Sequence, residues 1–509
     1  MSKVVEMKGI TKVFPGTVAN DHVDFDLERG EIHVLLGENG AGKTTLMNIL
    51  YGLYQQTSGD IYINGQKQDI RGPNSAIALG IGMVHQHFML VENFTVAENI
   101  VLGNEPKKGL SLDMDAAKAS VREVSDRFGL EVDPEARIED ISVGLSQRVE
   151  ILKALHRGAE ILILDEPTAV LTPQEIDDLG EILKNLTQEG KSIILITHKL
   201  KEVLGMSDRV TILRRGKVIG TVKTSETTAD ELAEMMVGRQ VNLTSDKTEK
   251  KPGNVILSVE HLTVRDHRNL AAVKDISFEV REGEILAIAG VDGNGQKELV
   301  EALTGLAATE SGKVTLCGKD ITGAKPREVI ESGTGHIPQD RQKRGLILQS
   351  SLAENLILGY HYQPPFAKNG RMDQSKIIEH GKELIREFDI RTPGHEISAG
   401  SLSGGNQQKV IIAREFYKDP ALLIAAQPTR GLDVGAIEFV HMRLLEQRDN
   451  NKAVLLISLE LDEIMNLADR IAVIYQGQIV GILGAAEATE RKLGLMMAGG
   501  AATDKGEVS

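Results

Sequence analysis

The sequence has few of the features that mark secreted or membrane-spanning chains. Its 509 residues include one cysteine, Cys317, so an intrachain disulfide is excluded. The longest apolar runs, such as Ile161–Leu164 and Ala421–Ala426, are far shorter than the roughly 20 residues that span a bilayer. The first residues contain no apolar core of signal-peptide length. We therefore expect a cytosolic chain that does not cross a membrane by itself.

An excess of positive charge is also missing. Against 58 Lys and Arg residues the chain has 73 Asp and Glu, a net charge of −15. Nucleic-acid binding draws most of its affinity from Lys and Arg contacts with phosphates, so no nucleic-acid partner is expected. The 41% hydrophobic and 26% charged residues are ordinary for a folded protein. The length suits three or four domains, or a larger unit that is repeated.

A long internal repeat is present. The stretch GEIHVLLGENGAGKTTLMNILYGL from Gly30 recurs as GEILAIAGVDGNGQKELVEALTGL from Gly283. The second copy has eight extra residues, all between the equivalents of Gln86 and Ser142. The offset is 253 for Gln86 and Gln339, 256 for Thr95 and Ser351, and 261 for Ser142 and Ser403. A duplicated domain of about 250 residues follows.

The repeat predicts the domain organisation. We expect a first domain at 1–240, a polar linker at 241–253, a second domain at 254–500 and a polar tail at 501–509. Short β-branched or aliphatic runs alternate with helical patterns in each copy. This alternation predicts an α/β fold with a mainly parallel sheet, and the segment from about Glu98 to Arg157 predicts an inserted helical subdomain.

A phosphate-binding loop is predicted between a strand and a helix of the first copy. Its glycines let backbone N–H groups surround phosphate oxygens, Lys43 can reach the β- and γ-phosphates, and Thr44 can ligate Mg²⁺. A glycine-rich turn without function is the alternative. The candidate ATP-binding residues are Gly37, Glu38, Asn39, Gly40, Ala41, Gly42, Lys43, Thr44 and Thr45.

Polar residues follow three further strands of the first copy. Asp165 and Glu166 end an apolar strand, where Asp165 suits a Mg²⁺ ligand and Glu166 a general base. His198 ends another strand and could bond the γ-phosphate or the attacking water. Gln86 could contact Mg²⁺ or that water through its amide. Taken singly, the acidic pair could be a solvated turn and the histidine a structural residue.

These motifs together resemble the nucleotide-binding subunits of ABC transporters. GENGAGKTT, Gln86, ILILDEPT and ITHKL occur in the order of that family, and LSGGNQQKV at Leu402–Val410 is similar to its signature motif. The resemblance implies ATP and Mg²⁺ as cofactors, and two domains that pair head to tail. It also implies that Phe14 stacks on the base, although packing at a strand end would explain Phe14 equally well.

The second copy departs from the family at the catalytic positions. Gln296 stands in place of Lys43, and a lysine displaced to 297 points about 100° away around the helix. Further replacements remove the metal ligand, the base and the histidine. These are Ala426 for Asp165, Gln427 for Glu166 and Leu459 for His198.

The signature motifs show the opposite asymmetry. The second copy keeps Ser403, Gly404 and Gly405, and Asp433 resembles the aspartate of the family's interdomain loop. The first copy has Val143 in place of the first glycine and Thr172 in place of the aspartate. Head-to-tail pairing would therefore combine every intact part in one site and every defect in the other. We interpret this as one hydrolytic site and one site that at most binds nucleotide.

The resemblance favours an ATPase subunit that energises import through two separate permease subunits, at the cytoplasmic face of the cell membrane. Segments such as IGMVHQHFMLV, GHIPQDR and AAQPTRGLDVGA are similar to nucleoside importers that use a basic-membrane-protein-type lipoprotein. Ribose, galactose or xylose import is the alternative. A soluble ABC ATPase acting on ribosomes or DNA is disfavoured by the short linker and the charge of −15.

Overall fold

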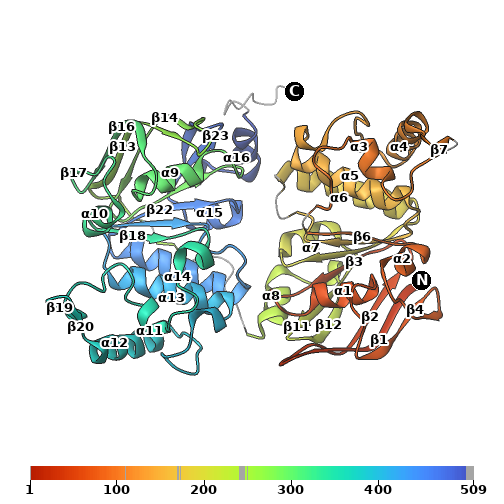
Figure 1. Cartoon of the computed structure of the whole chain (residues 1–509), viewed down its shortest axis with the longest axis horizontal. Helices are drawn as coiled ribbons and strands as arrows, with labels where there is room; N and C mark the ends of the chain where they lie inside the picture. Colours follow the sequence, from red (N-terminus) through yellow and green to blue (C-terminus); the bar gives the residue numbers. More distant parts are fainter. Residues whose placement is uncertain are drawn as a thin grey trace. The chain divides into compact units, whose positions relative to one another are not determined.

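The computed structural model describes residues 2–86, 88–108, 111–168, 171, 173–239, 247–248 and 250–499. The chain forms two compact units, Met1–Val241 and Asn242–Ser509 (Figure 1). Residues 241–246 and 249 of the predicted linker and the predicted tail at 501–509 lie outside the described part.

The first unit is built on a six-stranded sheet whose strand order is β12-β11-β3-β10-β9-β6. Every neighbouring pair is parallel except β11 and β12, which pair antiparallel at one edge. The central strands are buried along their whole length, as continuous apolar runs require when both faces of a sheet are covered. The strands are β3 (Ile32–Leu36), β6 (Ile81–Val84), β9 (Ile161–Asp165), β10 (Ser192–Thr197), β11 (Arg209–Arg214) and β12 (Lys217–Lys223).

A second, antiparallel sheet covers one face of the first. Its order is β2-β1-β4-β5, and it shares a core with α1 (Lys43–Leu50) and α2 (Pro73–Ala78). The strands are β1 (Lys3–Phe14), β2 (Thr17–Glu28), β4 (Ser58–Ile63) and β5 (Gln66–Gln68). The predicted α/β class with a mainly parallel sheet is confirmed, and this antiparallel layer is an addition to it. Other helices of the unit are α6 (Pro173–Gln188), α7 (Leu200–Met206) and α8 (Ala229–Val237).

Helices lie between β6 and β9, as the sequence predicted. They are α3 (Val96–Val101), α4 (Met114–Phe128) and α5 (Val143–His156), with the short hairpin β7 (Lys107–Lys108) and β8 (Ser111–Leu112). Local side chains start each helix: Thr95 forms a capping box with Glu98, Asp113 accepts from Ala116 N, and Ser142 accepts from Leu145 N.

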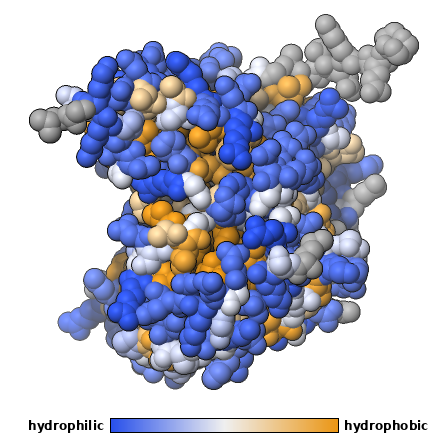
Figure 2. Space-filling model, turned by 90° about the vertical axis from the view of Figure 1, so that its right-hand side faces the viewer, coloured by the Kyte–Doolittle hydropathy of each residue, from blue (hydrophilic) through white to orange (hydrophobic). Residues whose placement is uncertain are grey.

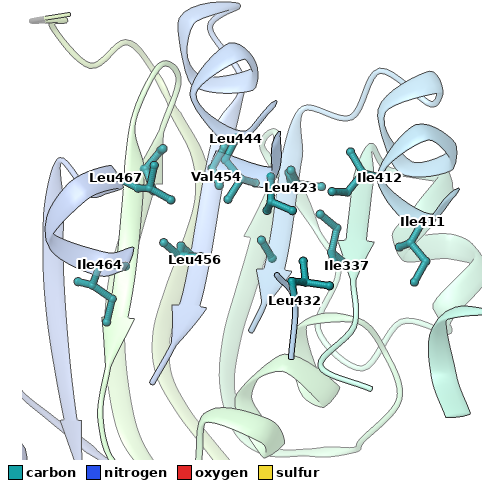
Figure 3. Packing of buried hydrophobic residues seen from close by; sticks show 14 of the residues in the cluster. Ile337, Ile411, Ile412, Leu423, Leu432, Leu444, Val454, Leu456, Ile464 and Leu467 are labelled. Atoms are coloured by element: carbon teal, nitrogen blue, oxygen red, sulfur yellow. The ribbon is translucent and has the colours of Figure 1, made fainter. Parts of the chain in front are cut away.

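The second unit repeats both sheets, in the orders β18-β21-β22-β15-β23-β24 and β14-β13-β16-β17. Its larger core cluster gathers side chains of the parallel sheet and the adjoining helices, among them Ile337, Leu423, Val454 and Leu456 (Figure 3). The strands are β13 (Val255–Arg265), β14 (Ala271–Arg281), β15 (Ile285–Ala289), β16 (Thr309–Leu316), β17 (Lys319–Asp320), β18 (Thr334–Ile337), β21 (Leu422–Ala426), β22 (Ala453–Ser458), β23 (Arg470–Tyr475) and β24 (Gln478–Gly484).

The helices of the second unit follow the same order, with one addition after β18. Part of the extra sequence of this copy forms a π-helical turn, Arg341–Gly345. The helices are α9 (Gln296–Leu303), α10 (Pro326–Glu331), α11 (Leu352–Asn355), α12 (Gln374–Glu387), α13 (Gly404–Tyr417), α14 (Val434–Asp449), α15 (Leu461–Leu467) and α16 (Glu490–Met497), and the hairpin is β19 (Ala367–Lys368) with β20 (Arg371–Met372).

The described part of the polar stretch before β13 is bound to the second unit. Arg448, which is 1% exposed, donates to the carbonyl of Thr248 at 2.9 Å and pairs with Asp469 at 2.8 Å. Lys247 also pairs with Asp469, at 3.2 Å, and Lys250 donates to the Arg448 carbonyl at 3.1 Å. These residues therefore pack against the domain that they precede.

Among the described helices, none combines the length and the apolarity needed to cross a bilayer. Figure 2 shows a face of the molecule that carries the first unit. That face is mostly hydrophilic, with apolar side chains gathered toward its middle (Figure 2).

Candidate functional site

The phosphate loop of the first unit joins β3 to α1 and is tightly enclosed. Gly42 has φ 101°, and a Cβ there would lie 2.3 Å from the carbonyl oxygen of Ala19. A Cβ on Gly37 would lie 2.3 Å from the carbonyl oxygen of Leu213. The buried amide of Asn20 donates to the Gly42 carbonyl at 3.1 Å. Only glycine fits at positions 37 and 42, so strands β2 and β11 fix the shape of the loop.

Lys43 lies inside this loop, and its side chain is buried. Its Nζ donates to the carbonyls of Gly37 at 2.7 Å and Glu38 at 3.0 Å. Burial lowers the pKa of Lys43, while the charges of Glu166, Asp165 and Glu38 act against this change. The ammonium thus lies within the loop, bound to two of its carbonyls.

Asp165 ends β9 directly beside α1. The hydroxyl of Thr44 forms a hydrogen bond with its carboxylate. Burial, together with the charge of Glu166, raises the pKa of Asp165 from 3.8 to about 6, although Thr44 and Lys43 act in the other direction. The buried carboxylate of Asp165, the partly buried one of Glu166 and the Thr44 hydroxyl offer oxygen donors of the kind that Mg²⁺ prefers, and a divalent cation would relieve the repulsion between the two carboxylates. The residues present therefore fit the metal.

Gln86, Glu166 and His198 come together at the ends of three neighbouring strands. Gln86 Nε2 lies 3.0 Å from Glu166 Oε2, and His198 Nδ1 lies 3.0 Å from Glu166 Oε1. Glu166 follows the last residue of β9 in the left-handed region, with φ 47°, which directs its side chain between its two partners. The sequence had proposed these three residues separately, and the structure places them in one cluster.

The pKa values of Asp165 and Glu166 are shifted in opposite directions. Burial acts to raise the pKa of Glu166, but the hydrogen bond from His198 and the charges of His198, Lys43 and Lys199 outweigh it, so the net effect is a lowered pKa. The pKa of Asp165 is raised. Adjacent carboxylates with pKa values pushed apart are typical of sites in which one member accepts a proton. As the pH rises, Glu166 therefore loses its proton before Asp165 does.

Glu202 is a positioning residue that the sequence did not reveal. It is buried at the start of α7, where its carboxylate accepts from the hydroxyl of Thr197 at 2.7 Å and from that of Thr168. Thr197 directly precedes His198, and Thr168 follows Glu166 by two residues. One carboxylate therefore holds the ends of β9 and β10 together. An acidic residue in a short helix gives no sequence signal for this role.

Phe14 is half-buried at the end of β1. Its ring meets Tyr54 edge to face with centroids 5.5 Å apart, and Lys12 Nζ lies 5.0 Å from its centroid. The ring thus packs at a strand end. The base-stacking role stays a prediction.

In the second unit, the equivalent positions lack this chemistry. Gln296 is buried at the start of α9, where its amide nitrogen has no hydrogen-bond partner, while Lys297 is exposed. Ala426 is buried, and Gln427 keeps the left-handed backbone of its counterpart, with φ 44°. The lysine displaced by one position therefore points out to solvent, as its helical geometry predicted.

The signature residues of the second unit gather at the start of α13. Ser403 precedes the helix without capping it, and Asn406 Nδ2 donates to Ser403 Oγ at 3.0 Å. Asp433 caps α14 by accepting from Ala436 N at 2.7 Å, and its carboxylate lies 3.7 Å from where a Cβ on Gly405 would stand. The structure thus brings Ser403, Gly404, Gly405 and Asp433 into one small region of this unit.

The corresponding region of the first unit is different. Ser142 caps α5 through Leu145 N at 3.3 Å, and Val143 is 46% exposed in place of a glycine. A Cβ on Gly144 would lie 2.4 Å from Glu175 Oε1, so a carboxylate stands beside the start of this helix. A negative side chain at this point opposes the binding of a phosphate. Thr172, the predicted counterpart of Asp433, lies outside the described residues.

Comparison with known proteins agrees with this geometry. The pattern of the ABC transporter family matches residues 20–169 and 273–430. Guanosine import ATP-binding protein NupO of Bacillus subtilis is 56% identical over 509 residues, with 100% of both chains covered. Nucleoside import ATP-binding protein NupA of Lactococcus lactis is 55% identical over 497 residues, which cover 98% of each chain. Ribose import ATP-binding protein RbsA 1 of Rubrobacter xylanophilus is 41% identical, covering 98% of this chain and 99% of its own. This chain belongs to the ABC transporter family.

Proposed function

We propose that the chain is the ATP-hydrolysing subunit of an importer and that Glu166 is its catalytic base. The observation that supports this role best is the convergence of Gln86 and His198 on the two oxygens of Glu166. An ionised carboxylate held from both sides can orient a water molecule and accept its proton as that water attacks the γ-phosphate. His198 then stabilises the orientation of the base.

The remaining residues of the first unit hold the nucleotide. The N–H groups of Gly37–Thr45 and the start of α1 surround the phosphates, and Lys43 exchanges its loop carbonyls for phosphate oxygens. Thr44 and Asp165, together with Gln86, would hold Mg²⁺, which when bound neutralises charge on the β- and γ-phosphates. The raised pKa of Asp165 means that metal binding releases a proton from this carboxyl when the pH is below about 6.

One hydrolytic site per chain follows from the complementary contents of the two units. The first supplies the loop, the metal ligands and the base, and the second supplies Ser403, Gly404, Gly405 and Asp433. We propose that they act head to tail on one ATP. The opposite combination would join Gln296 and Ala426 to a helix start that Glu175 already occupies.

A groove on the first unit suits a permease contact. It has a volume of about 150 Å³ and lies next to Gln86 in sequence and in space, with His85 and the 62% exposed Met89 in its lining. Tyr51, Ile77, Met83, Glu150 and Lys153 are other lining residues. A change at Gln86 on hydrolysis would reach a segment bound there, which suits coupling to the two transmembrane subunits at the inner face of the membrane.

Nucleosides are the proposed cargo. The two relatives of 55% and 56% identity carry nucleoside and guanosine import in their names, and the relative named for ribose import is more distant, at 41%. Because the cargo passes through other subunits, the support for nucleosides comes from the similarity over the full chain. The proposed import system also includes an extracytoplasmic solute-binding lipoprotein. Import of simple sugars is the second candidate.

The test of the catalytic role is Glu166→Gln. The substituted amide still accepts from one neighbour but takes no proton, so we expect ATP binding to persist while turnover falls at least about 100-fold. Gln427→Glu is the matched change in the second unit, and it should not add a second hydrolytic site, since Ala426, Gln296 and Leu459 remain. Turnover by Glu166→Gln close to that of the natural chain would refute the assignment.

The test of the cargo is uptake in source cells that carry either the natural chain or Glu166→Gln. We expect labelled nucleoside uptake to fall in the variant while labelled ribose uptake stays unchanged. Loss of ribose uptake alone would replace the nucleoside proposal with the sugar proposal.

A further inference from the structure

The extra residues after Gln339 have no part in the function proposed so far. They form the π-helical turn Arg341–Gly345, whose start is fixed by Asp340, which accepts from the backbone N–H groups of Gln342 at 3.1 Å and Lys343 at 3.0 Å. The other end is held by Arg414, which donates to the Gly345 carbonyl at 2.8 Å. Turns of this kind are uncommon and often occur at functional sites.

Arg341, the first residue of the turn, reaches the signature region of its own unit. Its Nη1 donates to the carbonyl of Arg430 at 2.7 Å, in the segment that leads to Asp433. Its Nη2 lies 2.6 Å from where a Cβ on Gly404 would stand, and 3.8 Å from the same point on Gly431. The guanidinium therefore lies between the start of α13 and the segment before α14, and a side chain at position 404 would displace it.

Arg341 is partly exposed, and the acid that acts on its charge is Asp340, which precedes it in the chain. No carboxylate within the described ranges forms an ion pair with it, and its buried Nε has no hydrogen-bond partner. Burial lowers its pKa, with Asp340 acting in the other direction. A buried donor without a partner costs free energy, so the position of the Arg341 Nε needs a compensating role.

The described residues of the first unit contain no such arrangement. Its chain is three residues shorter between Gln86 and Thr95 than the second between Gln339 and Ser351, and its register places Phe88 opposite Arg341. There, Glu175 lies beside Gly144 at the start of α5. The cation accompanies the intact signature, and a carboxylate accompanies the degenerate one.

We propose that Arg341 is a positioning residue of the ATPase site: it fixes the start of α13 against the Arg430–Asp433 segment and thereby sets the affinity for ATP. This inference rests on the proposed role of Ser403–Gly405 in holding the nucleotide. Because the base and metal ligands belong to the first unit, loss of Arg341 should weaken ATP binding more than it slows the chemical step.

The experiment measures KM for ATP and kcat of the full chain for Arg341→Ala, Arg341→Lys and Arg344→Ala. Arg344 is the matched control, because it lies on the same turn but pairs with Glu301 at 2.7 Å, away from the signature. We expect Arg341→Ala to raise KM about 10- to 100-fold, the usual effect of losing a charged hydrogen bond, with a much smaller change in kcat. Arg341→Lys should recover part of this loss, and Arg344→Ala should leave KM within about twofold.

Two outcomes separate this inference from the proposed function. If Ser403→Ala raises KM while Arg341→Ala behaves like Arg344→Ala, the role of Arg341 is refuted and the signature role stands. If Ser403→Ala leaves KM unchanged, the proposed signature role itself fails and Arg341 loses its basis. Should Arg341→Ala unfold early in a thermal melt, Arg341→Gln keeps an amide donor for Arg430 and takes its place, with an unchanged KM again refuting the proposal.

Discussion

Asp165 costs the first unit stability when its carboxyl is ionised. The pKa of this group lies at about 6 in the folded chain against 3.8 ordinarily, because burial and Glu166 disfavour its charge. One pKa unit corresponds to about 1.4 kcal/mol, so the cost is about 3 kcal/mol at a pH above 6. Asp165→Asn keeps the shape and an acceptor for Thr44 while removing the charge, and it should recover an amount of this order.

The sign of the pH dependence follows from linkage. Between pH 3.8 and about 6 the folded chain holds a proton that the unfolded chain releases, so this group stabilises the fold at low pH and its contribution is lost as the pH rises. The stability difference between Asp165→Asn and the natural chain should therefore be near zero at pH 4 and reach about 3 kcal/mol at pH 8. The difference isolates Asp165 from carboxyls with lowered pKa values, such as Glu166 and Asp26.

Scanning calorimetry of the full chain at several pH values, without nucleotide or Mg²⁺, measures this difference. The converse change, Ala426→Asp, puts a carboxylate at the same strand end of the second unit, where no lysine or threonine compensates it. It should destabilise that unit by about 3 kcal/mol or more at pH 8. A stability difference for Asp165→Asn that does not change with pH, or a stable Ala426→Asp, would show that the electrostatic argument is wrong.

Two further substitutions test the enclosure of the phosphate loop and the buried ion pair of the second unit. Gly42→Ala places a Cβ 2.3 Å from the Ala19 carbonyl, so ATP binding measured by calorimetry should be lost, whereas Gly40→Ala, with φ +81° and open space around it, should cost only about 1–2 kcal/mol of backbone strain. Equal affinities in the two variants would contradict the enclosure described for this loop. Arg448→Ala removes the fully buried partner of Asp469, which keeps Lys247 at 3.2 Å, and should lower the free energy of unfolding of the second unit by about 1.5–3 kcal/mol in urea titrations. Arg443→Ala is its control, since Arg443 pairs with Glu446 on a partly exposed surface; similar losses in both would refute the special role of Arg448.

Much of the fold could be predicted because the internal repeat presents the same pattern of apolar runs and motifs twice. The buried runs Ile161–Leu164 and Ile193–Ile196 predicted parallel strands, and residues at the ends of these strands had to meet at one sheet edge. For this reason Glu166 and His198 could be assigned before their contact was seen. The antiparallel sheet was missed, since β1 and β2 are long, irregular strands with register shifts and only partial alternation of buried and exposed residues.

The residues that position other side chains could not be identified from the sequence. Asn20 lies 22 residues from Gly42, and Glu202 lies 34 residues from Thr168, although only five from Thr197; neither belongs to a motif. Arg341 lies in an insertion whose conformation, a π-helical turn, has no composition of its own. Glu175, two residues into α6, reads as an ordinary acidic residue near a helix start, and its place beside Gly144 depends on the packing of two helices.

The left-handed backbone conformation has a different consequence at Gln427 from that at Glu166. Both positions bear the conformational cost of a side chain at positive φ, about 1–2 kcal/mol each. At Glu166 this geometry directs the proposed base, whereas Gln427 has no carboxylate to direct. The second unit therefore keeps the backbone geometry of the proposed catalytic turn without its carboxylate. A substitution that relieves this strain at position 427 would stabilise the protein and leave the proposed base in place, whereas the same substitution at position 166 would remove that base.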